Sequence, residues 1–212
     1  MNVKPKIRNM LKLIRRLNRG LYIRTWNMVN RIRFDHLGKR SYIRNYLLLQ
    51  GSKNVWIGDF VYIAYKCWIA AVPLKEGQKC ILKIGKGTHI GNFCHIYATQ
   101  SIAIGEDVLI ADRVYISDNM HNYKSVDLPI IDQSIKQLMP VTIGSGSWIG
   151  ENVCVIGANI GRNCVIGANS VVNKDIPDYC VAVGAPARII KKFCHERNQW
   201  CLTDSKGVFL EG

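Results

Sequence analysis

Histidine is the residue type in this chain whose spacing is most informative about chemistry, because an imidazole can take up a proton near neutral pH or bind zinc. The five histidines are His36, His89, His95, His121 and His195. A zinc site of the hydrolytic kind needs three ligands that converge. His89 and His95 are six residues apart within a six-residue repeat, so we expect them to point in different directions and we expect no metal site. His121 lies in a long interruption of this repeat, where it is either a general base or a solvated loop histidine.

The six-residue period begins at residue 57 and must position these side chains. Aliphatic residues followed by Gly or Ala recur at Ile57-Gly58, Ile63-Ala64, Ile69-Ala70, Ile84-Gly85, Ile90-Gly91, Ile104-Gly105, Ile110-Ala111, Ile143-Gly144, Ile149-Gly150, Ile160-Gly161 and Ile166-Gly167. Such a period fits neither a helix nor the alternation of a half-buried strand. It is typical of a parallel β-helix, in which short strands are joined by tight corners and stacked coils cover each other's apolar faces. The fifteen units found predict an all-β fold of about five coils, if three faces make one coil.

Interruptions of the period indicate where the chain departs from the regular coil. Residues 117–142 form a long excursion, and a segment of this length inside a compact domain is usually functional or disordered. The step between inward aliphatic residues lengthens to eight between Ile96 and Ile104. It shortens to five between Val155 and Ile160, which predicts a tightened corner.

The ends of the chain differ from the repeat. The period stops after Val183, and Pro186 followed by residues 187–200 predicts a C-terminal helix that begins with proline. We therefore expect three parts: a basic, partly helical N-terminal arm over 1–50, a β-helix domain over 51–185, and a C-terminal helix and tail over 186–212.

Most of the net charge of +14 is in the N-terminal arm, because residues 1–50 carry thirteen Lys and Arg and one acid. Over residues 5–21 the apolar side chains fall on one side of a helix and the basic ones on the other. Such a helix can lie on an anionic membrane surface or cover the end of the β-helix. We expect no nucleic-acid partner, because no recognition motif accompanies the charge.

No targeting or spanning segment is expected. The longest aliphatic runs are far shorter than the ~20 residues that cross a bilayer, and basic residues break up any signal-peptide core. The eight cysteines include no C-x-x-C pair and are expected to be reduced core thiols. We expect a cytoplasmic protein, held at the inner face of the cytoplasmic membrane if the arm binds lipid.

The repeats, followed by Val171-Val-Asn-Lys-Asp-Ile-Pro177 and Val183-Gly-Ala-Pro-Ala-Arg188, resemble the hexapeptide-repeat acyltransferases. Within this family the chain is most similar to the lipopolysaccharide O-acetyltransferases, and more distantly to the galactoside and maltose acetyltransferases. The resemblance covers roughly residues 50–200. It implies a left-handed parallel β-helix that works as a homotrimer, with active sites between subunits.

The same resemblance implies a set of site residues. His121 takes the place of the family's catalytic histidine, within the segment Ser117-Asp-Asn-Met-His121. The O-antigen enzymes usually have a further histidine where this chain has Asn119, and a glycine where it has Asn122. Asp118 is expected to orient the imidazole, to bind the acceptor or to form a turn. Residues expected to bind acetyl-coenzyme A are Ala168, Asn173, Lys174, Arg188 and Lys191, and those expected on position alone to contact the acceptor are Asn92, His95, Asp118 and Tyr123.

The function that this resemblance implies is transfer of acetyl from acetyl-coenzyme A to a sugar hydroxyl in surface-polysaccharide or lipopolysaccharide synthesis. A hydroxyl is a poor nucleophile at neutral pH, and an imidazole such as that of His121 can remove its proton as it attacks the thioester. The acceptor would be a sugar or a lipid-linked glycan. An N-acetyltransferase of an amino-sugar nucleotide is the alternative, since it needs the same base. A zinc enzyme of the γ-carbonic-anhydrase type is less favoured because the histidines do not converge.

Overall fold

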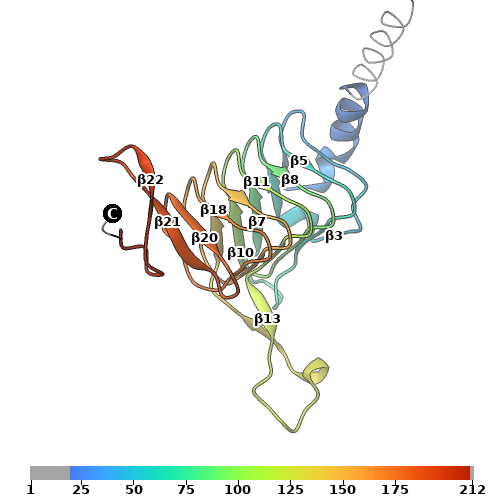
Figure 1. Ribbon diagram of the computed structural model, residues 1–212. Coiled ribbons are helices and arrows are strands. Elements are labelled where there is room, and N and C mark those ends of the chain that lie inside the picture. Colours follow the sequence, from blue (N-terminus) through green and yellow to red (C-terminus); the bar gives the residue numbers. More distant parts are fainter. Residues whose placement is uncertain (1–19, 211–212) are drawn as a thin grey trace, which may run out of the picture.

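Three parallel sheets form the walls of a β-helix in the computed structural model, which describes residues 20–210 (Figure 1). The first sheet contains β1 (His36–Leu37), β4 (Val55–Ile57), β7 (Ile81–Ile84), β10 (Ser101–Ile104) and β15 (Val141–Ile143). The second contains β2 (Tyr42–Ile43), β5 (Tyr62–Ile63), β8 (His89–Ile90), β11 (Leu109–Ile110), β16 (Trp148–Ile149), β18 (Val165–Ile166) and β20 (Cys180–Val183). The third contains β3 (Leu48–Gln50), β6 (Trp68–Ala71), β9 (His95–Ala98), β12 (Tyr115–Ser117), β17 (Cys154–Ile156) and β19 (Val171–Val172). This arrangement is typical of a left-handed parallel β-helix.

The core is a stack of the aliphatic residues that define the period. Ile57, Ile84 and Ile104 lie above one another in the first sheet, and each is almost completely buried. Because side chains alternate across a strand, one residue per short strand points inward and its neighbours point outward. The predicted inward positions are therefore confirmed.

The corners explain why glycine follows so many of the inward residues. A Cβ on Gly85 would lie 2.4 Å from the carbonyl carbon of Gly105 in the next coil. Other corner positions adopt a left-handed backbone without glycine, for example Phe93 at φ 57° and Arg113 at φ 57°. The tight stacking of the coils therefore leaves no room for a side chain at the glycine position of a corner. Other corner positions accept a side chain although their left-handed backbone is strained.

The first coil begins earlier than the repeat predicts. Residues 36–50, expected in the N-terminal arm, form β1, β2 and β3, which pair in parallel with β4, β5 and β6. Within residues 20–210 the third sheet thus has six strands, one for each complete coil, in place of the five coils expected. Leu37, Ile43 and Leu49 keep the six-residue spacing, but Arg44 and Gln50 stand where the repeat has Gly or Ala.

A helix precedes this coil and covers the end of its core. Residues 20–30 are helical and continue into a short 3-10 helix, η1 (Arg31–Arg33). Trp26 packs against Phe34, and the Asn27 amide donates to the carbonyl oxygens of Gly38 and Ser41. The helix predicted over residues 5–21 lies, apart from its last two residues, outside the described part of the chain. In that part no helix is both long and apolar enough to cross a bilayer.

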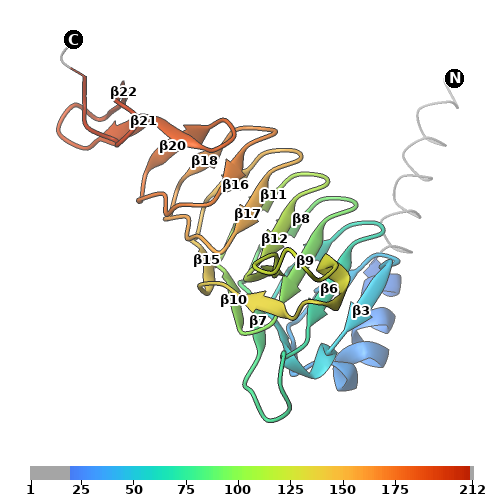
Figure 2. The same ribbon diagram turned by 90° about the horizontal axis from the view of Figure 1, so that it is seen from below.

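The C-terminal segment is a β-hairpin, so the prediction of a helix there was wrong. β21 (Arg188–Cys194) pairs antiparallel with β20, and β22 (Gln199–Leu202) pairs with β21 (Figure 2). The hairpin covers the edge that β20 would otherwise expose. Ala187 and Ile189 are buried while Arg188 and Ile190 are exposed, which is the alternation of a strand. Asn198, with φ 49°, supplies the left-handed turn residue.

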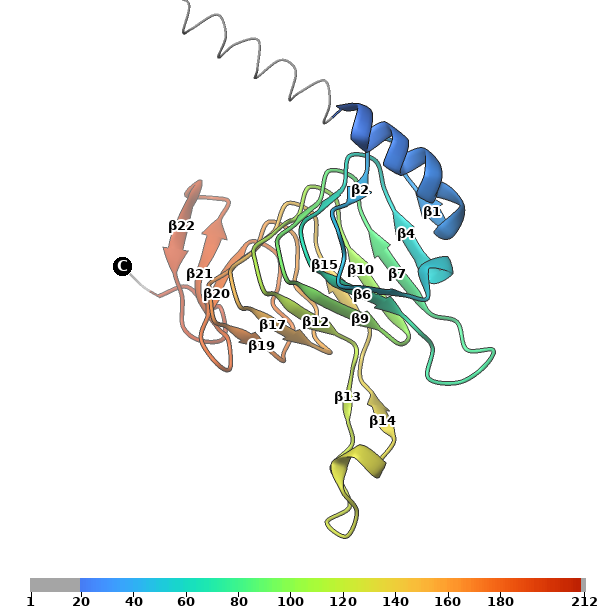
Figure 3. The same cartoon turned by 90° about the vertical axis from the view of Figure 1, so that its right-hand side faces the viewer.

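The excursion over residues 117–142 is ordered. β13 (Asn119–His121) pairs antiparallel with β14 (Ile135–Gln137), and η3 (Ile130–Asp132) lies at the far end. This hairpin leaves the body between the third and first sheets and projects from it (Figure 3). We call it the catalytic hairpin, because it carries His121, the general base that the family resemblance implies.

The eight cysteines are free thiols, as expected. Burial raises the pKa of Cys80 and that of Cys164 to about 11, so both thiols are protonated at neutral pH. Cys154 differs from the buried thiols because it is half-buried on the outer side of β17. None of these thiols contributes a nucleophile to the arrangement described below.

Candidate active site

His121 is the last residue of β13 and is exposed to solvent. It pairs with Ile135 across the catalytic hairpin, and its imidazole forms no hydrogen bond with any residue in the described range 20–210. The side chain is therefore available to a substrate, while the antiparallel pairing fixes its backbone. An imidazole that is open to solvent can reach the proton of a substrate hydroxyl, which is the first requirement of a general base.

Asp118 fastens the base of the catalytic hairpin to the body. Its side chain is completely buried. One carboxylate oxygen accepts hydrogen bonds from the Thr99 backbone N–H at 2.8 Å and the Thr99 hydroxyl at 2.9 Å. The other accepts from the backbone N–H groups of Gln100 and Ser101, each at 2.8 Å. No bond to His121 is present, so the contacts favour the turn-forming role of Asp118 over the acceptor-binding and imidazole-orienting ones.

The second strand of the hairpin is fastened by the same cluster. The Gln137 amide donates to the Asp118 carbonyl at 2.7 Å, and its oxygen lies 2.9 Å from the Thr99 hydroxyl, whose single proton is shared between Gln137 and Asp118. Leu138 then lies against Gly157. A Cβ atom added to Gly157 would come 2.8 Å from the Cβ of Leu138, and Gly157 itself has a left-handed backbone with φ +55°. Gly157 sits in the corner that the five-residue step shortens, so this corner leaves room for the returning strand.

Asn119 stands where the resembling enzymes have their first histidine, and it has a structural role here. It is 5% exposed, and its amide donates to the Tyr97 carbonyl and to Asp118, both at 3.2 Å. His121 is therefore the imidazole that this hairpin offers.

His95 lies on the outer face of the third sheet, in the coil before the hairpin. Its ring stacks on Trp68 with centroids 4.1 Å apart and lies 6.2 Å from the ring of Tyr97. Burial lowers the pKa of His95, which favours the neutral imidazole. Its Nε2 atom is buried and has no hydrogen-bond partner within residues 20–210. This nitrogen is an unused polar group on the face next to the hairpin.

The other two expected acceptor contacts have different surroundings. The Asn92 amide donates to the carboxylate of Asp112 in the next coil, at 3.2 and 3.1 Å, and its oxygen accepts from the Tyr65 backbone. Asn92 thus links three coils at the corner between the second and third sheets. Tyr123 follows His121 on the hairpin and is 64% exposed.

The residues expected to bind the coenzyme are all exposed and surround the last strands: Ala168, Asn173, Lys174, Arg188 and Lys191. Ala168 lies shortly before β19, and Asn173 and Lys174 come directly after this strand. The Ala187 N–H donates to the Val171 carbonyl at 2.8 Å, which places the start of β21 beside β19. Lys191 lies further away, opposite Val181 of β20. β19 is two strands from β12, so about 10 Å separates this end from the base of the hairpin.

The histidines of the repeat do not converge. His89 lies on β8 in the second sheet and His95 on β9 in the third, and each pairs with a different neighbour. No group of three or more His, Cys, Asp or Glu side chains between residues 20 and 210 is arranged to hold a metal ion.

Sequence reasoning missed the residues that support the hairpin, namely Thr99, Gln137, Leu138 and Gly157. The eight-residue and five-residue steps marked two of the coil positions involved, at 96–104 and 155–160. Nothing local in the sequence indicated Gln137, because its partner Thr99 is 38 residues away.

Comparison with known proteins gives relatives over most of the chain. A family model described as a hexapeptide repeat of succinyl-transferase matches residues 140–174. Galactoside O-acetyltransferase of Escherichia coli is 31% identical over 169 residues, which are 79% of this chain and 75% of that protein. WbbJ of Escherichia coli, named for lipopolysaccharide biosynthesis O-acetyl transfer, is 39% identical over 57% of this chain and 65% of its own length. A Mycobacterium tuberculosis protein named as an acetyltransferase is 43% identical over 64% of this chain, but only 43% of its own length is matched.

Solved structures share the architecture. AntD, an N-acyltransferase from Bacillus cereus, superposes with a TM-score of 0.66 at 20% identity, covering 80% of this chain and 90% of that one, which shows the fold alone. The acetyltransferase VCA0836 from Vibrio cholerae, solved with acetyl-coenzyme A, has a TM-score of 0.56 at 25% identity and covers 82% of this chain and 83% of its own. Fold and site together define a hexapeptide β-helix with a histidine-bearing hairpin. The chain belongs to the hexapeptide-repeat acetyltransferase family.

Proposed function

We propose that this protein transfers acetyl from acetyl-coenzyme A to a hydroxyl of a sugar acceptor, with His121 as the general base. The observation that supports this most directly is the exposed imidazole of His121, which has no partner among the described residues, on a hairpin whose base is fastened to the β-helix. The names of the relatives, galactoside O-acetyltransferase and WbbJ, support a sugar acceptor and a place in lipopolysaccharide synthesis.

In this mechanism His121 removes the proton of the acceptor hydroxyl as the oxygen attacks the thioester carbonyl carbon. The bond from carbon to sulfur then breaks, and the proton held by His121 neutralises the departing thiolate of coenzyme A. The side chain of Tyr123 is exposed and is proposed to orient the acceptor, whereas His95 Nε2 is buried and does not reach it. Asp118 and Asn92 are assigned structural roles.

The proposal is tested by incubating the purified protein with radiolabelled acetyl-coenzyme A and extracted lipopolysaccharide or its component sugars. We expect acetyl transfer to oxygen that persists in excess EDTA, because no step uses a metal. Acetylation confined to amino sugars would replace the proposal by N-acetyl transfer. Activity that EDTA abolishes and zinc restores would favour the zinc-enzyme alternative.

The coenzyme is proposed to bind around β19, where Ala168, Asn173 and Lys174 are exposed beside Arg188. Removing Arg188 tests this directly, because charge-assisted contacts to a phosphate contribute about 1–3 kcal/mol. Arg188→Ala is expected to raise KM for acetyl-coenzyme A about 5- to 100-fold and to change kcat much less.

The matched control for Arg188 is Arg197→Ala, in the exposed turn of the C-terminal hairpin, which is expected to leave KM unchanged. Dephospho-coenzyme A identifies the contact: if Arg188 binds the 3′-phosphate, wild type and Arg188→Ala bind the truncated coenzyme almost equally. Unchanged binding of both coenzymes by Arg188→Ala would show that this residue is only a surface charge.

A homotrimer with shared active sites is proposed from the catalytic hairpin. Its outer part projects from the body and exposes apolar side chains, with Val126 95% and Ile131 86% exposed (Figure 3). Such a surface is stabilised when a second protomer covers it.

The N-terminal helix is proposed to hold the protein at the inner face of the cytoplasmic membrane. Opposite its packed side it exposes Met28, Val29 and Ile32, the last 79% exposed, beside Arg24 and Arg31. A double variant, Met28→Glu with Ile32→Glu, is expected to lower binding to phosphatidylglycerol vesicles at least about tenfold, since two apolar side chains lose a burial site.

Co-sedimentation with vesicles measures this loss. Leu202→Glu, an exposed apolar residue at the other end of the β-helix, is the control and is expected to bind vesicles as wild type does. Equal binding by the double variant and wild type would leave the helix with its capping role alone.

A further inference from the structure

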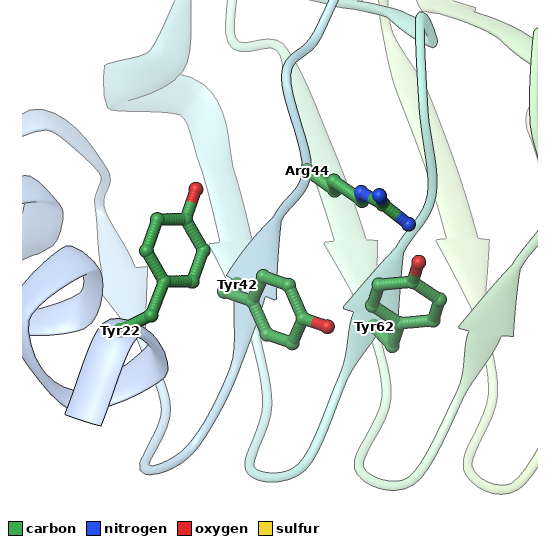
Figure 4. Close-up of a pocket in the computed structure, with 4 residues that line it drawn as sticks. All are labelled: Tyr22, Tyr42, Arg44 and Tyr62. Atoms are coloured by element: carbon green, nitrogen blue, oxygen red, sulfur yellow. The ribbon is translucent and has the colours of Figure 1, made fainter. Parts of the chain in front are cut away.

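A pocket lined by three tyrosines and one arginine lies at the N-terminal end of the second sheet (Figure 4). Tyr22 comes from the N-terminal helix, Tyr42 from β2, Arg44 from directly after β2 and Tyr62 from β5. Its volume is about 520 Å³, within the ~300–1,000 Å³ range of small-molecule sites. Figures 1 and 3 place the catalytic hairpin on another side of the β-helix, so this pocket is separate from the hairpin of its own protomer.

The aromatic rings form a continuous ladder across two coils and the helix. The centroids of Tyr22 and Tyr42 are 6.2 Å apart with perpendicular rings, and those of Tyr42 and Tyr62 are 5.0 Å apart. Because Tyr42 and Tyr62 are paired in the parallel ladder, their spacing is set by the backbone. Tyr42, 7% exposed, packs between the other two rings, so Tyr22 and Tyr62 are the tyrosines that can offer an apolar ring face to the C–H groups of a sugar and a hydroxyl for a hydrogen bond.

Arg44 adds a positive charge to this surface that no acid among residues 20–210 pairs with. Its side chain is exposed, and Figure 4 shows the guanidinium directed toward the hydroxyl end of Tyr62. The ion pairs formed within residues 20–210, Arg113 with Glu151 and Arg162 with Asp178, do not involve it. A guanidinium without an acidic partner, beside phenol hydroxyls, is suited to phosphate or carboxylate oxygens, which it binds with two parallel hydrogen bonds.

We propose that Tyr22, Tyr42, Arg44 and Tyr62 form a second binding site, for a sugar ring that carries a phosphate or a carboxylate. The sugar ring lies against Tyr22 and Tyr62, which Tyr42 supports from beneath, and the anionic group binds Arg44. Binding at this site does not depend on acetyl transfer, so it goes beyond the proposed function.

Isothermal titration calorimetry on the full chain tests this site with glucose 1-phosphate, glucuronate, glucose and inorganic phosphate. We expect at least one of the two anionic sugars to bind more tightly than both glucose and phosphate. The phosphate and carboxylate arms identify which anionic group is recognised. Arg44→Gln is expected to weaken that binding about 5- to 50-fold, and Tyr22→Ala, on the exposed helix, is expected to weaken it as well.

Two control variants show whether binding is specific to this pocket. Arg31→Gln, an exposed arginine in η1, is expected to bind as wild type does, and so is His121→Ala, which removes the proposed base and leaves the pocket intact. The proposal is overturned if neither anionic sugar binds. It is also overturned if Arg44→Gln binds as wild type does, or if phosphate alone binds as tightly as glucose 1-phosphate.

Discussion

Replacing His121 by alanine is expected to lower kcat for acetyl transfer about 10²- to 10⁴-fold, the contribution of a positioned general base. The imidazole is exposed and makes no hydrogen bond to other described residues, so its loss removes no structural contact. We therefore expect the melting temperature to stay within about 2 °C of wild type, because surface substitutions change stability by less than about 0.5 kcal/mol. KM for acetyl-coenzyme A is expected to remain close to its wild-type value.

His89→Ala is the matched control for His121→Ala. His89 is also an exposed histidine, but it lies on β8 in the second sheet and its ring contacts the Gly87 carbonyl. In steady-state kinetics, His89→Ala should therefore keep the kcat of wild type, while His121→Ala shows the whole expected loss of about 10²- to 10⁴-fold. If His121→Ala keeps near-normal turnover, the base is another group and the proposed mechanism fails.

The outcomes of the sequence-based predictions depend on whether a contact is local or distant. The inward positions such as Ile57 and Ile84 were predictable because each repeats the same coil geometry, so a short pattern carries the information. The first coil was missed because Arg44 stands at a corner where later coils have Gly or Ala, and because Gln50 stands where the next coil has Ala70. Its aliphatic spacing alone was a weaker signal, although Leu37, Ile43 and Leu49 do follow it.

The structure of the C-terminal segment, in contrast, is decided by a distant contact and could not be predicted from a local pattern. Residues 187–200 are compatible with a helix, because Ile189 and Phe193 are four residues apart. The outcome was decided by the unpaired edge of β20, which no local pattern reveals. At the site, His121 was reached through family resemblance, whereas the support from Gln137 and Thr99 required the coordinates because it joins distant segments.

Asp118→Ala is expected to have the largest effect on stability, because it removes a completely buried carboxylate that accepts from the backbone N–H groups of Thr99, Gln100 and Ser101. Loss of several hydrogen bonds to one charged, buried carboxylate costs about 3–5 kcal/mol. For a chain of this size that corresponds to a melting temperature lower by about 6–20 °C. Asp118→Asn keeps the shape and one acceptor oxygen, so we expect it to recover part of this loss.

The same substitution separates a general structural role for Asp118 from positioning of the catalytic hairpin. Asp112→Ala is the control, because Asp112 also binds the backbone N–H of a residue in the preceding coil, Asn92, at a corner away from the hairpin. Assayed well below their melting temperatures, Asp118→Ala should lose kcat about 10-fold or more while Asp112→Ala keeps it, because a displacement of His121 by about 1 Å is enough for such a loss. Equal kcat values in the two variants, with stability lowered in both, would mean that Asp118 stabilises the β-helix without positioning the base.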